Sequence, residues 1–171
     1  MYRFCLCVLL FVSGSIGSVH AGELEDVQAL TRKTVNDVLT VLRTEEMSRG
    51  EKSQEVLQII RPVFNFNLMA MLSLGRKHWV GLTEAQREKF IALFIDQLRT
   101  SYFSKAEMFA EKKIRFQSAQ WENRSQNKIR VPTYVLLKGE KTSMIYKFYQ
   151  SKSEWRIYDV EIEDVSLVRS Y

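Results

Sequence analysis

A long amphipathic segment over residues 83–103 constrains the fold of this chain more than any other feature. At about 100° per residue, six of its large apolar side chains fall on one arc, namely Phe90, Ile91, Phe94, Ile95, Leu98 and Tyr102. Thr83 and Gln86 have the spacing of a capping box, and Glu84 places a negative charge in the first turn, where the helix dipole favours it. A helix of about twenty residues spans about 30 Å. Its apolar face therefore needs a broad apolar partner.

The sequence after Phe109 can supply that partner, because its hydrophobic period changes from 3.6 to 2. Alternation over residues 114–118, 129–135 and 144–149 predicts three strands, and Gly139 marks a turn between two of them. A fourth predicted strand, over 154–162, switches the parity of its apolar residues after Ile157. Since one strand cannot present both parities to one core, we expect a β-bulge near Tyr158 and Asp159, or cover on both faces.

The first half of the chain predicts helices. Apolar residues at helical spacing over 24–42 predict a helix that ends before Gly50, and a shorter helix over 53–60 ends before Pro62. The apolar-rich run over residues 63–75 indicates one or two buried helical turns, which Gly75 ends as a C-cap. N-terminal helices and one long helix, packed on a four-stranded antiparallel meander, make an α+β fold.

Residues 1–21 have the features of a cleaved signal peptide. Arg3 supplies the positive charge, an apolar run follows over 4–12, and Ala21 ends a plausible cleavage site. The run is too short to cross a bilayer, although a retained N-terminal anchor is the alternative. Both cysteines, Cys5 and Cys7, lie in this leader. We therefore expect residues 22–171 to form a single exported domain without a disulfide.

Charge and side-chain inventory argue against nucleic-acid binding and against catalysis. One of the 25 basic residues and none of the 20 acidic residues lies in the leader, which leaves 24 against 20 and no basic footprint for nucleic acid. After the leader the sequence has a single histidine, His78, and no cysteine to complete a nucleophile or metal set with it. We therefore predict no catalytic residue, metal ligand or cofactor.

Four late carboxylates form the one acidic group, Asp159, Glu161, Glu163 and Asp164. They lack the loop spacing of a calcium site, and alternate acids on a strand usually face solvent. An exported enzyme that uses these carboxylates is one alternative function, and it requires them to converge in a cleft. Asp159 interrupts an apolar strand, so we expect it to be hydrogen-bonded inside the fold.

The many apolar side chains allow two interpretations. They either fill a core, or they line an apolar pocket left where helices and sheet do not close on one another. Periodicity does not separate the two, because pocket walls and cores share one pattern. Methionine and aromatic side chains suit a cavity that adapts to flexible tails.

Two long patterns occur in the same order in a known protein family. The first is Pro62-Val63-Phe64-Asn65-Phe66, followed by Met69-Ala70, Leu74-Gly75, Trp79 and the spaced Thr83, Gln86, Phe90, Phe94, Leu98 and Tyr102. The second is Trp155-Arg156-Ile157-Tyr158-Asp159-Val160, leading into Glu163-Asp164-Val165-Ser166-Leu167-Val168. With these patterns, nearly all of residues 22–171 resembles the MlaC / toluene-tolerance family of periplasmic phospholipid-binding proteins.

The resemblance implies a cystatin-like fold and a soluble periplasmic carrier, not an enzyme, whose cargo is a phospholipid. It implies that the lipid tails lie between sheet and helices with the head group exposed. The implied partners are an inner-membrane ABC lipid transporter complex and an outer-membrane lipoprotein/porin complex, in a system that maintains outer-membrane lipid asymmetry. We expect a monomer that reaches the periplasm through its signal peptide.

The predicted lipid-binding residues come from the long helix, the segment before it and the sheet. They are Met69, Leu72, Phe90, Phe94, Leu98, Val131, Met144, Tyr146, Phe148 and Ile157. Two further alternatives remain: a hopanoid-associated carrier of the same family, and an exported protein-binding adaptor of the same fold. The adaptor predicts an exposed apolar patch rather than an enclosed cavity.

Three features depart from the family pattern. Asn65 stands where the family often has Asp, which removes a charge before the helix. Asp164 replaces the usual Gly, so that turn must accept a side chain. The sequence ends at Tyr171, where many relatives continue into further helices, and we expect a more open pocket or a different ligand as a result.

Overall fold

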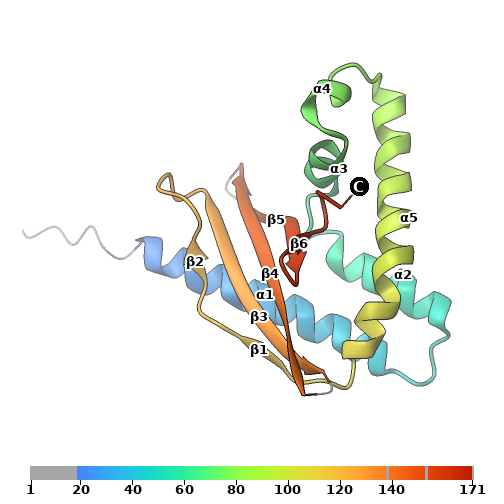
Figure 1. Ribbon diagram of the computed structural model, residues 1–171, viewed down its shortest axis with the longest axis vertical. Helices are drawn as coiled ribbons and strands as arrows, with labels where there is room; N and C mark the ends of the chain where they lie inside the picture. Colours follow the sequence, from blue (N-terminus) through green and yellow to red (C-terminus); the bar gives the residue numbers. More distant parts are fainter. Residues whose placement is uncertain (1–18, 138, 153, 171) are drawn as a thin grey trace, which may run out of the picture.

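The computed structural model describes residues 19–137, 139–152 and 154–170 (Figure 1). Its helices come first: α1 (Val19–Arg43), α2 (Arg49–Ile60), α3 (Phe66–Leu74), α4 (Arg76–Trp79) and α5 (Glu84–Phe109). Its strands are β1 (Ile114–Phe116), β2 (Gln120–Trp121), β3 (Lys128–Leu137), β4 (Glu140–Ser151), β5 (Glu154–Ile162) and β6 (Val165–Ser166). Residues 1–18 of the predicted signal peptide lie outside the described residues.

The strands form one antiparallel sheet in the order β1-β3-β4-β5-β6, with β2 paired to β3 beside β1. The strands β1, β3, β4 and β5 correspond to the four strands of the predicted meander. The two-residue strands β2 and β6 were not predicted, because two residues carry no alternation. The α+β class is confirmed.

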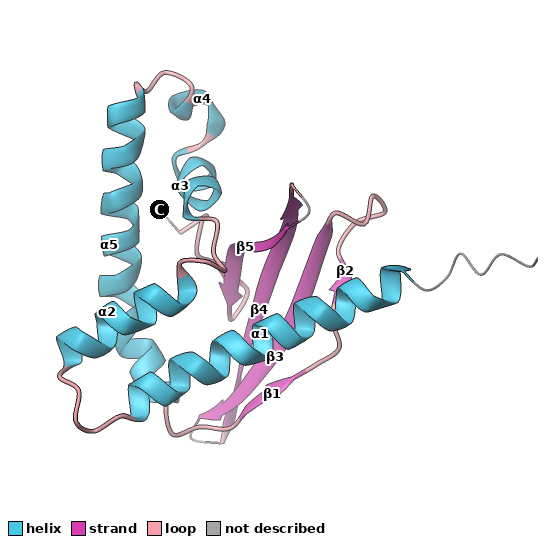
Figure 2. Ribbon diagram, turned by 180° about the vertical axis from the view of Figure 1, so that it is seen from behind, coloured by secondary structure: helices cyan, strands magenta, loops and turns pink. Residues whose placement is uncertain are grey.

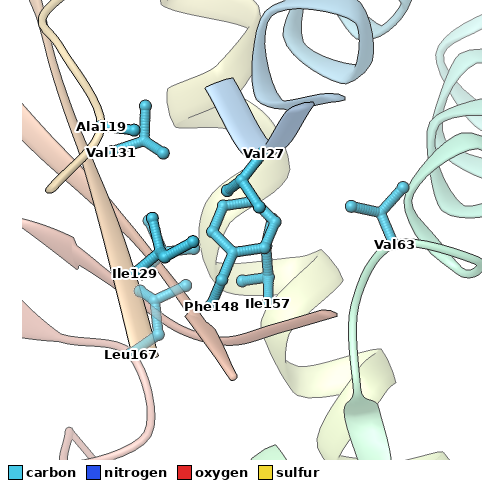
Figure 3. Packing of buried hydrophobic residues seen from close by; sticks show 9 residues of the cluster. Val27, Val63, Ala119, Ile129, Val131, Phe148, Ile157 and Leu167 are labelled. Carbon is cyan, nitrogen blue, oxygen red and sulfur yellow. The ribbon is translucent and has the colours of Figure 1, made fainter. Parts of the chain in front are cut away.

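Helix α1 crosses one face of the sheet (Figure 2). Figure 3 shows Val27 of α1 beside Phe148 of β4 and Ile157 of β5, and each of these side chains is exposed by 1% or less. Ile129 and Val131 of β3 belong to the same buried cluster. The core therefore lies between α1 and one face of the meander, whose apolar residues alternate toward that face.

Helix α5 begins as its sequence predicts. The Thr83 side chain accepts from the Gln86 backbone N–H at 3.3 Å, and the Gln86 side chain accepts from the Thr83 N–H at 2.9 Å. Its first half packs on α3, where Phe94 and the fully buried Met69 share a cluster. Its second half continues to Phe109, past the predicted end, and packs near the C-terminal end of α1.

Local capping explains where the shorter helices begin and end. Helix α2 starts before the predicted residue 53, because Ser48 and Glu51 form a second capping box. In front of α3, Asn65 Oδ1 accepts from the Leu68 N–H at 3.0 Å, so a neutral amide caps this helix. Gly75 ends α3 with a φ of 84°, a conformation that favours glycine.

The predicted β-bulge is present in β5. Lys147 pairs with Asp159 while its neighbour Phe148 pairs with Ile157, which leaves Tyr158 as the extra residue. Ile157 and Val160 are consequently both buried despite their opposite parity.

The same strand is covered along part of its outer edge. The Ile157 N–H donates to the Val63 carbonyl at 2.9 Å, and the Asn65 N–H donates to the Ile157 carbonyl at 2.8 Å. The segment between α2 and α3 thus forms a parallel bridge to the middle of β5. Further along the strand, β6 pairs with Glu161 and Ile162.

The turn between β5 and β6 consists of Glu163 and Asp164, whose φ angles are 51° and 64°. Two positive φ values are what a two-residue type I′ hairpin turn requires. Residues other than glycine, asparagine and aspartate rarely adopt them. The turn accepts a side chain at Asp164, as expected, but in a left-handed conformation.

We predict that Asp164→Gly raises the free energy of unfolding by up to about 1 kcal/mol. A non-glycine residue in the left-handed conformation costs about 1–2 kcal/mol, which glycine avoids. The greater freedom of glycine in the unfolded chain offsets part of this gain. Urea denaturation measures the change. The same substitution at Asp26, an exposed α1 residue without positive φ, should lower stability instead. A D164G protein less stable than the wild type would show that this turn is not strained.

Candidate functional site

A partly open cavity of about 240 Å³ lies between the sheet, α1, α2 and α5. Its wall is almost entirely apolar. The sheet and the segment after it contribute Ile114, Met144, Tyr146, Ile157, Val160, Ile162 and Leu167, and α3 with its preceding loop contributes Phe64, Phe66 and Met69. The remaining apolar wall comes from α1, α2 and the second half of α5, including Val35, Val38, Leu39, Leu42, Val56, Leu57, Ile60, Leu98, Phe103 and Phe109.

The buried polar groups of the wall are uncharged. The Thr31 and Thr34 hydroxyls donate within α1, to the carbonyls of Val27 at 2.7 Å and Leu30 at 2.9 Å. Burial raises the pKa of Tyr146 to about 12, so its phenol stays uncharged at neutral pH. The cavity interior therefore suits a hydrocarbon ligand rather than a charged one.

The charged residues of the wall are Arg99 and Lys105, and both belong to α5. Both are exposed, so their charges lie at the opening of the cavity rather than inside it. The site thus has an apolar interior and a cationic opening on the α5 side.

Five of the predicted lipid-binding residues line this cavity, namely Met69, Leu98, Met144, Tyr146 and Ile157. They come from α3, α5, β4 and β5 and converge because the inner sheet face and the arc of α5 face one another. Whether they contact lipid stays a prediction.

The other five predicted residues lie elsewhere. Val131 and Phe148 have no exposed surface and belong to the core under α1. Phe90 and Phe94 stack at 6.5 Å between ring centroids in the cluster that joins α5 to α3. Leu72 is 42% exposed and borders a separate cleft. The first four share parity or helical face with the cavity residues, but they lie where another element already covers them, whereas Leu72 faces away from the cavity.

The sequence analysis missed the contribution of α1 and α2 to the wall. Val35, Val38 and Leu39 of α1 follow the helical spacing that predicts this helix, but that spacing does not say which partner the face meets. It also missed Phe109, which lies past the predicted end of the helix at residue 103, and Phe103, which lies outside the predicted apolar arc.

A second cleft, of about 500 Å³, lies on the opposite sheet face and has both charged and apolar lining residues. Lys147 pairs there with Glu161 and, at 3.6 Å between Nζ and Oε1, with Glu122. Burial lowers the pKa of Lys147, but these two carboxylates outweigh it and the net pKa is raised. The Tyr158 hydroxyl donates to Glu122 at 2.9 Å. The pKa of Tyr158 is raised, mainly by burial and secondly by the negative charge of Glu122. Each charged group of this network therefore has a partner within it.

The late acidic residues do not form one group. Asp159 is 4% exposed, and its carboxylate accepts from the Ser166 hydroxyl at 2.7 Å and the Val168 N–H at 3.3 Å, as expected for a residue bonded inside the fold. Glu163 and Asp164 are exposed in the turn. Within the described residues, no three His, Cys, Asp or Glu side chains gather in a way that could hold a metal ion.

Comparison with known proteins places the chain in a family. The sequence model of the MlaC protein family matches residues 32–171. The chain belongs to the MlaC family. None of the proteins with curated descriptions is similar enough to match it. In the part of the chain that the structure describes, no helix is long and apolar enough to span a membrane.

A solved structure supports the MlaC-family fold. A phospholipid-binding protein from Ralstonia solanacearum, determined in complex with a phospholipid, matches with a TM-score of 0.70. The two sequences are 23% identical, and the match covers 82% of this chain and 80% of the other. The similarity shows that the two proteins share the fold.

We predict that Asp159→Ala lowers the free energy of unfolding by about 2–3 kcal/mol, because it leaves two buried donors without an acceptor. Ser166→Ala removes the hydroxyl that donates to Asp159 and accepts from the Arg169 N–H, but that N–H keeps the Ser166 carbonyl as an acceptor at 3.3 Å. This variant should therefore cost only about 1 kcal/mol. Urea denaturation of both variants measures the difference. Equal, small effects would mean that Asp159 does not hold residues 166–168, and with them the cavity residue Leu167, in place.

Proposed function

We propose that this MlaC-family protein is a phospholipid carrier, not an enzyme, that encloses acyl chains between its sheet and α1, α2 and α5. The observation that carries the proposal is the apolar cavity, whose charged wall residues lie at its opening. An amphiphile has the matching polarity, with an apolar end that enters and a polar end that remains near solvent. The phospholipid in the Ralstonia solanacearum structure of the same fold supports this ligand class.

The volume of the cavity indicates how much lipid it encloses in this conformation. A cavity of about 150 Å³ holds one benzene molecule, so 240 Å³ corresponds to about ten carbon atoms. Burying ten methylene groups at about 0.8 kcal/mol each gains about 8 kcal/mol. Association costs at least about 4 kcal/mol, which leaves an affinity of about millimolar. Retention of a cargo lipid therefore requires more of its two chains to be buried.

We propose that the second half of α5 moves outward when lipid enters. The contacts that hold it to the other helices include an exposed ion pair, in which Arg49 Nε lies 3.1 Å from Glu107 Oε2, and a part-buried hydrogen bond from Arg43 Nε to the Ala110 carbonyl at 2.7 Å. Exposed ion pairs contribute at most about 1 kcal/mol each. Their loss costs little compared with the burial of additional methylene groups.

We also propose that the protein acts in the periplasm, exported by residues 1–21, between an outer-membrane lipoprotein/porin complex and an inner-membrane ABC transporter. In this role it would help to maintain outer-membrane lipid asymmetry. Membership of the MlaC family supports this placement. A carrier for such a route must bind lipid reversibly, which agrees with a small cavity that opens for its cargo.

Mass spectrometry of the protein purified under native conditions tests the proposal. We expect a mass increment that equals one phospholipid, and its release on denaturation. Lipid-free protein that also fails to take up lipid from mixed micelles would contradict the proposed function.

We predict that Leu98→Trp reduces lipid occupancy severalfold, because a larger side chain fills a wall position of the cavity. The unfolding free energy should change by less than about 1 kcal/mol, since the indole enters space that is already empty. Leu93→Trp is the matched control, because Leu93 lies on the same helix and is 59% exposed. Equal lipid occupancy in the two variants would place the lipid outside this cavity.

A further inference from the structure

The two charged wall residues are arranged to act together. Arg99, Tyr102 and Lys105 follow one another at three-residue steps, so they lie on one side of α5, and all three line the cavity. Six residues of helix rise about 9 Å, which two long side chains can bridge from both ends. One compact anionic group at the opening can therefore contact both cations.

The local charge balance favours an anion at this position. Arg99 Nη2 lies 2.5 Å from Asp96 Oδ1, but both residues are exposed, and such a pair is weak. The Lys105 ammonium lies 5.0 Å from the Tyr102 ring centroid, which leaves its charge uncompensated by that contact. The nearest acid along the helix after Lys105, Glu107, already pairs with Arg49 at 3.1 Å. The opening thus carries a net positive charge next to an uncharged interior.

We propose that Arg99 and Lys105 form a phosphate site for the head group of the bound lipid, so that the protein selects phosphodiester lipids over uncharged ones. This inference rests on the proposed carrier function, which supplies the acyl chains. A guanidinium presents a planar fork of donors to phosphate oxygens, and an ammonium acts as a point charge. The head group is then held at the α5 side of the opening instead of being free in solvent.

The site also fixes the direction in which the lipid lies. With its phosphate between Arg99 and Lys105, the chains extend away from α5 toward Met144 and Ile157 of the sheet. A polycyclic hydrocarbon or a diacylglycerol fills the same interior but gains nothing from the two cations. Selectivity for the phosphate should therefore appear as a difference between lipids with identical chains.

The test compares the double variant R99Q/K105Q with the wild type on two soluble probes, dioctanoyl phosphatidylglycerol and dioctanoylglycerol. We expect R99Q/K105Q to bind the phospholipid about tenfold more weakly, as two exposed charge contacts predict, and dioctanoylglycerol with unchanged affinity. The wild-type affinity for the phospholipid should fall as salt rises, and the variant should lose this dependence. The double variant K77Q/K89Q is the matched control, because Lys77 of α4 and Lys89 in the first half of α5 are exposed and neither lines the cavity.

Each other outcome has a distinct meaning. If the wild type binds neither probe, the proposed carrier function itself fails. If R99Q/K105Q binds the phospholipid as the wild type does, or loses both probes equally, the phosphate site is overturned while the carrier function stands. If the lysine control loses as much affinity for the phospholipid as R99Q/K105Q does, the effect is one of net charge, and the phosphate site is also overturned.

Two further measurements separate the lipid phosphate from other anions. Inorganic phosphate at millimolar concentration should not displace bound phosphatidylglycerol, and displacement would assign the site to free phosphate. Vesicles of phosphatidylglycerol and phosphatidylcholine test surface attachment. If R99Q/K105Q loses only vesicle binding while its affinity for the soluble phospholipid is unchanged, the two cations dock a membrane surface and the inference fails.

Discussion

The packing of α1 on the sheet is the interaction on which the other features depend. Near its start, Val27 lies directly on Phe148 and Ile157, and this contact excludes solvent (Figure 3). Two turns later the same apolar face of α1, at Val35 and Leu39, lines the cavity instead. A straight helix laid across a twisted sheet meets it closely over a limited length. The cavity is the space left where α1 and the sheet diverge and α2 and α5 close the sides.

The bulge in β5 is the second requirement. Without the extra residue at Tyr158, Ile157 and Val160 would face opposite sides of the sheet, and the cavity wall would lose one of them. The same irregularity places Asp159 where its carboxylate accepts from Ser166 and from the backbone at Val168. The inserted residue thus keeps Ile157 and Val160 on the apolar face of the sheet. It also lets Asp159 hold residues 166–168 in place through hydrogen bonds.

Much of the fold could be predicted from the sequence, because the signals are local. The Thr83 capping box, the Gly75 helix end, the change of period after Phe109 and the parity switch after Ile157 each concern residues a few positions apart. The α2 start was missed because the Ser48 capping box was overlooked, and the two-residue strands give no periodic signal.

The candidate site was harder to predict. Met144 and Phe148 lie on the same face of β4, yet one lines the cavity and the other is buried beneath α1. Alternation along a strand states which face a side chain takes. It does not state at which residue along that face α1 stops contacting the sheet. That position depends on the angle between α1 and the sheet. Phe94 and Leu98 differ in the same way, because α3 covers only the first half of α5.

The bridge from the α2–α3 connection to β5 has a consequence for how molecules of this protein meet. An uncovered edge strand offers a row of backbone donors and acceptors to a strand from a neighbour, which is a route to aggregation. Here the main-chain groups of Ile157 are taken by Val63 and Asn65, and the end of the strand is taken by β6. A strand from a neighbouring molecule could not pair continuously along β5, because the backbone groups at the middle and at the end of this strand are already hydrogen-bonded. This edge of the sheet therefore offers no continuous backbone template for polymerisation.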